Sequence, residues 1–366
     1  MVAFGFSIYP EHHDVSKVKE YMSLLKKYGA ERIFMSLLQI ETDDVETFKK
    51  YKEIIDYANQ LKMRVIADIS PTFIEQNDWN GQLVEKANEY GLAGIRLDEA
   101  LPLEEIVDLT KNDYGLKIEL NMSTDKKLLT ELLASDANLD NIIGCHNFYP
   151  HEFTGISVEH FNDMSQFYYE NGIETAAFIS SQTAEEGPWP VSEGLPTIEE
   201  YRHLSIYQQV QLLKAAGTID NILISNQFIS EEELKECRSS LDSECKSFEV
   251  EVIEDITEIE RQIVAFKHHY RGDVSSYVLR STIPRTMYTK DSIAPRDNQS
   301  KVVTRGSIII DNDRYSRYKG ELQIALKDFS VSDKANIVGA ISADSLSLLD
   351  YLKPWEDFRL EDSRRQ

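Results

Sequence analysis

Residues 115–123 read GLKIELNMS, a stretch that looks like a buried parallel strand with a charged residue at its centre. Ile118 and Leu120 flank Glu119 with apolar side chains. A buried carboxylate without compensation is costly, because it must shift its pKa or find a partner. The rest of the chain therefore has to account for Glu119.

Strand-like runs of this kind recur over the first two thirds of the chain and alternate with stretches of helical periodicity. The eight runs are AFGFSIY (3–9), RIFMSLL (32–38), RVIADIS (64–70), GIRLD (94–98), KIELNMS (117–123), NIIGCHNF (141–148), ETAAFIS (174–180) and NILISNQF (221–228). Their number and spacing predict an α/β fold, a closed (β/α)8 TIM barrel. An open doubly wound sheet is the weaker alternative, because IYPEHHD after the first run is not a glycine-rich phosphate loop.

The rhythm changes after SEEELKECRSSLDSEC (230–245), where strand-like runs follow one another with little helix between them. The runs are SFEVEVI (247–253), SYVLRST (276–282), GSIIIDN (306–312), GELQIAL (320–326) and NIVGAIS (336–342). They predict a small, mostly antiparallel β domain. We therefore expect a barrel domain over residues 1–235 and a β domain over 245–366, with the boundary within 228–245.

Composition limits the function and the location of the protein. The formal net charge of -24 argues against nucleic acid as a partner, although a small anionic substrate fits if basic residues gather locally. The N-terminus lacks the pattern of a signal peptide, and no apolar run approaches the roughly 18 residues of a membrane span. Three cysteines without a CxxC pair suit a reducing compartment. We expect a cytoplasmic protein with no membrane contact.

Alternate residues of a barrel strand face the interior, and this parity collects polar side chains at the C-terminal ends of the middle strands. The residues placed there are Asp68, Arg96, Asp98, Glu119, Asn121 and, by the same count, His146. Active sites of such barrels form at this end. A buried ion pair is the structural alternative for any single acid.

Carboxyl groups on neighbouring strands can separate their pKa values, so that one protonates a leaving group while the other stays ionised. This favours glycoside hydrolysis, in which the two groups stand about 5–5.5 Å apart for retention or about 6.5–9.5 Å apart for inversion. We predict Glu119 and Asp98 as the catalytic pair. The sequence leaves open which is the acid and which the nucleophile or base, and an apolar setting, which raises the pKa of a carboxyl group, favours Glu119 as the acid. Asp68 is the reserve, as a partner of Arg96 or a ligand of a sugar hydroxyl.

Metal and serine chemistry fit the sequence less well. EHHD (11–14) lacks the ligand spacing of a zinc motif, and neither HExxH nor G-x-S-x-G occurs. We therefore expect no metal and no cofactor. Tyr9, Phe148, Tyr149 and Trp189 follow strand ends or lie in a mouth loop, where aromatic faces suit a sugar ring. Ordinary loop packing is the alternative for these aromatics.

Several motifs resemble the bacterial 6-phospho-N-acetylmuramidases, and the similarity covers essentially the whole chain. They are GFSIYPE (5–11), GIRLD, KIELNMS, CHNFYPHEFTG (145–155), STIPR (281–285), RGSIIIDN (305–312) and RYKGELQI (317–324). The resemblance implies a TIM barrel followed by a cyclophilin-like β-barrel domain. It implies hydrolysis of N-acetylmuramic acid 6-phosphate β-1,4-linked to N-acetylglucosamine, in peptidoglycan recycling during cell wall turnover. The implied partner is this small phosphorylated amino-sugar disaccharide, and a homo-oligomer is compatible with the sequence.

Such a substrate carries a phosphate and a lactyl carboxylate, so an acidic chain needs a local basic pocket to hold it. Arg280, Arg285, Arg296 and Arg305 of the second domain are the candidates, since the planar fork of Arg binds oxyanions in pairs. Surface pairing with acids such as Asp311 is the alternative. Two other functions stay open: a non-catalytic carbohydrate-binding or surface-interaction protein, and a peptidyl-prolyl isomerase, which fold resemblance alone supports only weakly.

Overall fold

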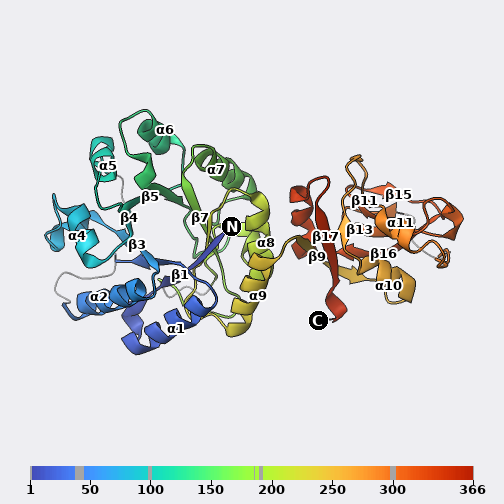
Figure 1. Ribbon diagram of the computed structural model, residues 1–366, viewed down its shortest axis with the longest axis horizontal. Coiled ribbons are helices and arrows are strands. Elements are labelled where there is room, and N and C mark those ends of the chain that lie inside the picture. Colours follow the sequence, from blue (N-terminus) through green and yellow to red (C-terminus); the bar gives the residue numbers. More distant parts are fainter. Residues whose placement is uncertain are drawn as a thin grey trace. The chain divides into compact units, whose positions relative to one another are not determined.

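The chain forms two compact units, Met1–Leu241 and Asp242–Gln366. The computed structural model describes residues 2–37, 45–97, 101–184, 186–188, 193–296 and 302–365. Unit 1 is a closed barrel of eight parallel strands, β1 to β8, and Figure 1 shows its helices around the outside of the strands. Unit 2 is built mainly from one seven-stranded sheet.

Each of the eight runs predicted for the barrel contains one of its strands, and the predicted TIM-like barrel is confirmed. The strands are β1 (Ala3–Ile8), β2 (Arg32–Ser36), β3 (Arg64–Ile69), β4 (Gly94–Leu97), β5 (Lys117–Asn121), β6 (Ile142–Cys145), β7 (Glu174–Ile179) and β8 (Asn221–Ile224). Because outer helices cover one face of each strand and the barrel core covers the other, these strands are almost entirely buried.

Some of the helix ends of unit 1 carry residues suited to those positions. They are α1 (Val15–Lys27), α2 (Val45–Gln60), α3 (Pro71–Gln76), α4 (Leu83–Tyr90), α5 (Leu103–Thr110), α6 (Lys127–Leu133), α7 (Val158–Glu170), α8 (Ile206–Ala216) and α9 (Glu231–Asp242). Ser205 and Gln208 form a capping box at the start of α8. Gly91 ends α4 with a φ of 93°, a conformation that costs glycine little.

Polar and apolar side chains both fill the barrel interior. At the N-terminal ends of the strands, Arg64 donates to Glu174 at 2.8 and 3.2 Å, and Asn221 donates to Glu174 at 2.8 Å. Nearer the C-terminal ends lies an apolar cluster, whose members are Phe34, Cys145, Ala176, Phe178 and Leu223. Phe148 packs against this cluster. The barrel interior is therefore a packed core, and side chains able to reach a ligand are expected at its C-terminal mouth.

Unit 2 places its seven strands in the order β10-β17-β9-β16-β13-β14-β11, and β12 pairs with β15 separately. The strands are β9 (Lys246–Val252), β10 (His268–His269), β11 (Val278–Ser281), β12 (Val302–Val303), β13 (Ser307–Asp311), β14 (Leu322–Ala325), β15 (Phe329–Ser330), β16 (Ala335–Ile341) and β17 (Asp357–Asp362). All neighbours pair antiparallel except β17 and β9. The short helices are α10 (Glu258–Val264), α11 (Ile283–Met287) and α12 (Ala343–Leu346). A cyclophilin-like fold for this unit stays a prediction.

Within the described ranges, every helix falls short of the length and apolarity that crossing a membrane requires.

Candidate active site

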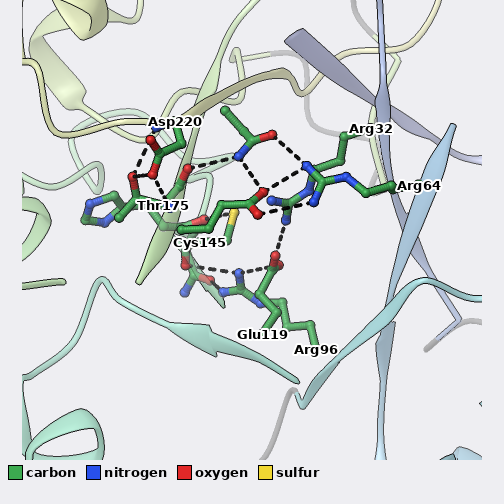
Figure 2. Close-up of polar contacts among 11 residues, drawn as sticks. Arg32, Arg64, Arg96, Glu119, Cys145, Thr175 and Asp220 are labelled. Carbon is green, nitrogen blue, oxygen red and sulfur yellow. Dashed lines mark hydrogen bonds and ion pairs between the residues drawn. The ribbon is translucent and has the colours of Figure 1, made fainter. Parts of the chain in front are cut away.

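Glu119 lies on the inner face of β5, where two arginines hold it. Nη2 of Arg32 donates to Oε2 of Glu119, and Nη1 of Arg96 stands 3.4 Å from Oε1 (Figure 2). No part of the Arg32 or Glu119 side chain is exposed. The cost of burying this carboxylate is therefore offset by two guanidinium groups.

We expected an apolar setting for Glu119, and this expectation is wrong. Two cationic guanidinium groups contact its carboxyl group. Both of its oxygens accept hydrogen bonds from arginines. Its role as a general acid stays a prediction, and the geometry favours a positioning role instead. Arg32 retains donors, since its Nε and Nη1 have no hydrogen-bond partner among the described residues.

Arg96 connects Glu119 to the mouth of the barrel. Its Nη1 donates to the carbonyl oxygen of Cys145 at 3.1 Å, and its Nη2 donates to Oδ1 of Asn147. Asn147 is half-buried just beyond the end of β6. Sequence reasoning missed Asn147, although strand parity was the signal that could have found it.

His146 does not face the barrel interior, so its predicted placement is wrong. The register pairs Asn121 with Cys145, and laterally paired residues of a parallel sheet share a face. His146 therefore points outward, where its Nε2 lies 2.9 Å from Oγ of Ser165 in α7. Burial, with the charge of Arg96 adding to it, lowers the pKa of His146 to about 3. A neutral His146 is thus part of the packing between β6 and α7.

Asp68 stands beside Arg96 on the inner face of the barrel. The two residues are paired in the register of β3 and β4, and both side chains are buried. Asn121 is half-buried, and its Oδ1 accepts from the backbone N–H of Ser123 at 2.9 Å. The predicted Asp98 and Trp189 lie outside the described residues. Of the predicted polar set, the structure thus brings together Asp68, Arg96, Glu119 and Asn121.

The aromatic residues predicted at the mouth differ in their exposure. Tyr9 is only 2% exposed, and its hydroxyl donates to the carbonyl oxygen of Ser225 at 2.8 Å. This burial excludes a stacking face for a sugar in the present arrangement. Phe148 packs edge-on against Phe34 and Phe178 and so belongs to the apolar cluster. Tyr149 is half-buried in the loop after β6 and remains a candidate for substrate contact.

Arg202 fastens together the loops that follow β6 and β7. Its side chain is 1% exposed, and it donates to the carbonyl oxygens of Tyr149, His151, Glu193 and Gly194. It also pairs with Glu199 at 2.6 Å.

Glu199, the partner of Arg202, also binds the backbone of the loop after β6. Its carboxylate accepts from the backbone N–H groups of Phe153 and Gly155, each at 2.8 Å. The bond from Arg202, followed by these backbone bonds, lowers the pKa of Glu199 to about 2 despite partial burial. The position of Tyr149 therefore depends on the pair formed by Arg202 and Glu199.

A more accessible acid at the mouth is Glu186, which contacts Nε2 of His13. The two side chains are 25% and 18% exposed, whereas Glu119 is fully buried. Lys17 Nζ lies 3.4 Å from Nδ1 of His13. Sequence reasoning weighed His13 only as a metal ligand and missed Glu186, because the loop that carries it has no strand pattern.

The arginines predicted to bind anions in unit 2 all have acidic neighbours. Arg280 and Arg285 share the buried Glu321, at 2.6 and 3.2 Å. Arg305 pairs with Asp350 at 2.6 Å on the surface. Arg296 pairs with Asp255 and Glu260, each at 2.5 Å. Their role in substrate binding stays a prediction, and only Arg280 and Arg285 converge on one point.

Among the described residues, no three His, Cys, Asp or Glu side chains form a group able to hold a metal ion. A cavity of about 660 Å³ has Arg64, Glu174 and Asn221 in its lining. It lies at the N-terminal ends of the strands, opposite the mouth at which active sites of such barrels form. We therefore place the candidate active site at the mouth and not in this cavity.

Comparisons with known proteins identify relatives over the whole chain. Residues 4–239 match a family model described as "6-phospho-N-acetylmuramidase, N-terminal", and residues 246–361 match "6-phospho-N-acetylmuramidase, C-terminal". A crystal structure of an uncharacterized B. cereus protein is 38% identical, with a TM-score of 0.85 over 98% of this chain and 99% of that chain. A conserved Enterococcus faecalis protein of unknown function shares the fold at 24% identity, with a TM-score of 0.72 over 99% and 97%. No curated protein matches the chain.

Proposed function

The chain belongs to the 6-phospho-N-acetylmuramidase family, and we propose that it is a glycosidase acting on a phosphorylated cell-wall disaccharide. The proposed reaction cleaves the β-1,4 link between N-acetylmuramic acid 6-phosphate and N-acetylglucosamine by water. Its products are N-acetylmuramic acid 6-phosphate and free N-acetylglucosamine. The proposed setting is peptidoglycan recycling in the cytoplasm, without a cofactor.

The observation that carries this proposal is the group of polar side chains at the barrel mouth. Asp68, Arg96, Asn121 and Asn147 come from β3, β4, β5 and the end of β6, four neighbouring strands. A sugar bound across these strand ends would meet a carboxyl group, a guanidinium and two amides. Amides suit sugar hydroxyls and an N-acetyl group, since each amide offers both a donor and an acceptor.

The carboxyl groups take different roles in this proposal. Asp68 lies at the C-terminal end of β3 beside Arg96, and we assign it the direct contact with the substrate, with the predicted Asp98 as its partner. Glu119 acts through Arg96, because both of its oxygens are already held by arginines. Arg96 then supports the mouth by fixing Asn147. A residue that acts in this way is a positioning residue rather than the proton donor.

The test is the release of N-acetylglucosamine from the phosphorylated disaccharide by the purified protein. We expect Asp68→Asn to abolish turnover with the fold intact, since the amide cannot transfer a proton or act as a nucleophile. Asp113→Asn, in the loop before β5, is the matched control, because it removes an exposed acid from unit 1. Tight binding of the disaccharide without turnover would favour the carbohydrate-binding alternative.

A further inference from the structure

Three motifs of unit 2 meet at one cluster of charged residues. STIPR contributes Arg285 and follows Arg280 directly, RGSIIIDN contributes Asp311, and RYKGELQI contributes Glu321. Register brings them together, because β14 lies between β11 and β13. Arg280 is the partner of Gln323 in β14, and the N–H of Asp311 donates to the carbonyl oxygen of Glu321 at 3.1 Å.

Glu321 is the buried anchor of the cluster. Its side chain is 1% exposed, and it accepts from Nε of Arg280 at 2.6 Å and from Nη1 of Arg285 at 3.2 Å. The two arginine side chains are 23% and 28% exposed. The buried carboxylate of Glu321 thus holds two guanidinium groups, and both arginine side chains remain partly exposed to solvent.

The other contacts orient the two guanidinium groups further. Arg285 stacks over the ring of Tyr318, with its Cζ 5.3 Å from the ring centroid. Arg280 Nη1 lies 3.6 Å from Asp273, which is itself paired with Arg271. An arginine carries five N–H donors, and two of the ten donors of this pair are used in the hydrogen bonds to Glu321.

We propose that Arg280 and Arg285 form an oxyanion-binding site and that its ligand is a phosphate monoester. Two guanidinium groups held side by side offer the planar, paired donors that phosphate oxygens accept. A phosphate has three terminal oxygens for these donors, whereas a carboxylate has two. The inference concerns unit 2 by itself, and this chemistry alone defines the ligand.

Protonation of Asp311 changes the affinity of this site for anions. It is buried and accepts from Gln323 Nε2 at 3.3 Å, and the charged groups that face it are Glu321, Arg280 and Arg285. Burial, then the charge of Glu321, raises the pKa of Asp311 to about 7 against the opposing effect of the arginines. Below that pH the cluster carries one negative charge fewer, so an anion binds more tightly at pH 6 than at pH 8.

The experiment is calorimetric titration of the full chain with methyl phosphate, sulfate and acetate. We expect saturable binding of methyl phosphate at one site, weakened roughly tenfold or more in Arg280→Lys and Arg285→Lys. Lysine keeps a charge for Glu321 and so preserves the fold. Arg314→Lys is the matched control, since Arg314 pairs with the exposed Asp333 at 3.0 Å, and its binding should equal that of the wild type.

Sulfate stays a dianion between pH 6 and pH 8, so it isolates the contribution of Asp311. We expect up to roughly tenfold tighter sulfate binding at pH 6 than at pH 8. Asp311→Asn should bind at pH 8 as tightly as the wild type does at pH 6. This is a gain of affinity that a damaged fold would not give.

The inference is overturned if the wild type shows no saturable methyl phosphate binding or if both lysine variants bind as well as the wild type. Acetate binding as tight as methyl phosphate would assign the site to a carboxylate instead. Because these titrations need no turnover, they stand even if the barrel proves inactive. Hydrolysis of the phosphorylated disaccharide by a chain that does not bind methyl phosphate would keep the proposed function and remove the inference.

Discussion

Arg96 and Glu119 are ion-paired inside the barrel, with 3.4 Å between Nη1 and Oε1, on adjacent strands. Arg96 also holds Asn147 at the mouth, so a fully buried carboxylate is connected to an accessible amide through one guanidinium. Residues that hold the site in place can therefore be distinguished from residues that contact the substrate. In our proposal Glu119 belongs to the residues that hold the site in place, and another acid reaches the substrate.

Glu119→Gln should destabilise the protein by about 3–5 kcal/mol, because it leaves Arg32 and Arg96 buried without their counter-charge. Glu174→Gln is the matched control. Glu174 also pairs with an arginine, but it is partly exposed, so about 1 kcal/mol or less should be lost. Urea unfolding followed by circular dichroism measures both values. Equal, small losses would contradict the interpretation of Glu119 as a buried structural ion pair.

Arg96→Lys should lower kcat by roughly 10²-fold and change the stability much less. Lysine keeps the positive charge beside Glu119 and loses the fork that also reaches Asn147 and the carbonyl oxygen of Cys145. Steady-state kinetics on the phosphorylated disaccharide, with urea unfolding of the same variant, gives the comparison. Wild-type kcat in this variant would show that fixing Asn147 does not matter for the reaction.

Buried His146 should make stability depend on pH in the acidic range. Because its pKa falls from 6.5 to about 3 on folding, the unfolded chain binds the proton more readily between these values. Stability is therefore fully present above about pH 6.5 and decreases as the pH falls toward 3, by about 2 kcal/mol between pH 7 and pH 5.

Urea unfolding of the wild type and of His146→Gln at pH 7 and pH 5 measures this contribution. The variant should lose less stability than the wild type over the interval, since it has no imidazole to protonate. His268 also has a lowered pKa, of about 4, and lies in unit 2, so His268→Gln separates the two effects. The same pH dependence in the wild type and in His146→Gln would remove the proposed contribution of His146.

Arg202→Gln should loosen the loop after β6. The N–H groups of Phe153 and Gly155 donate to Glu199, whose own position depends on Arg202. Hydrogen exchange at these two amides should quicken by roughly tenfold or more. His203→Gln is the control, because His203 is an exposed neighbour that pairs with Glu152 of the same loop. Unchanged exchange in Arg202→Gln would mean that the pair of Arg202 and Glu199 does not hold this loop.

The barrel was predictable from the sequence because its strands are buried on both faces and read as short apolar runs. The same logic located β9, β11, β13, β14 and β16 of unit 2. It missed the two-residue strands β10, β12 and β15, which are too short to carry a pattern. It also missed β17, because four of the six residues in its sequence DFRLED are charged.

The candidate site was less predictable, because its contacts depend on partners far apart in the chain. Glu119 and Arg32 are separated by 87 positions, and nothing near Glu119 in the sequence indicates that pairing. His146 shows a different limit. An error of one residue in strand parity moved it to the wrong face and hid Asn147, although Cys145 beside it points inward.

The most direct test of the proposed glycosidase is an assay of the wild type and Asp68→Asn on two substrates. These are N-acetylmuramic acid 6-phosphate β-1,4-linked to N-acetylglucosamine and the same disaccharide without the phosphate. We predict that the wild type releases N-acetylglucosamine from the phosphorylated disaccharide alone and that folded Asp68→Asn releases none. The absence of release by the wild type, or full activity in Asp68→Asn, would contradict the account of this site.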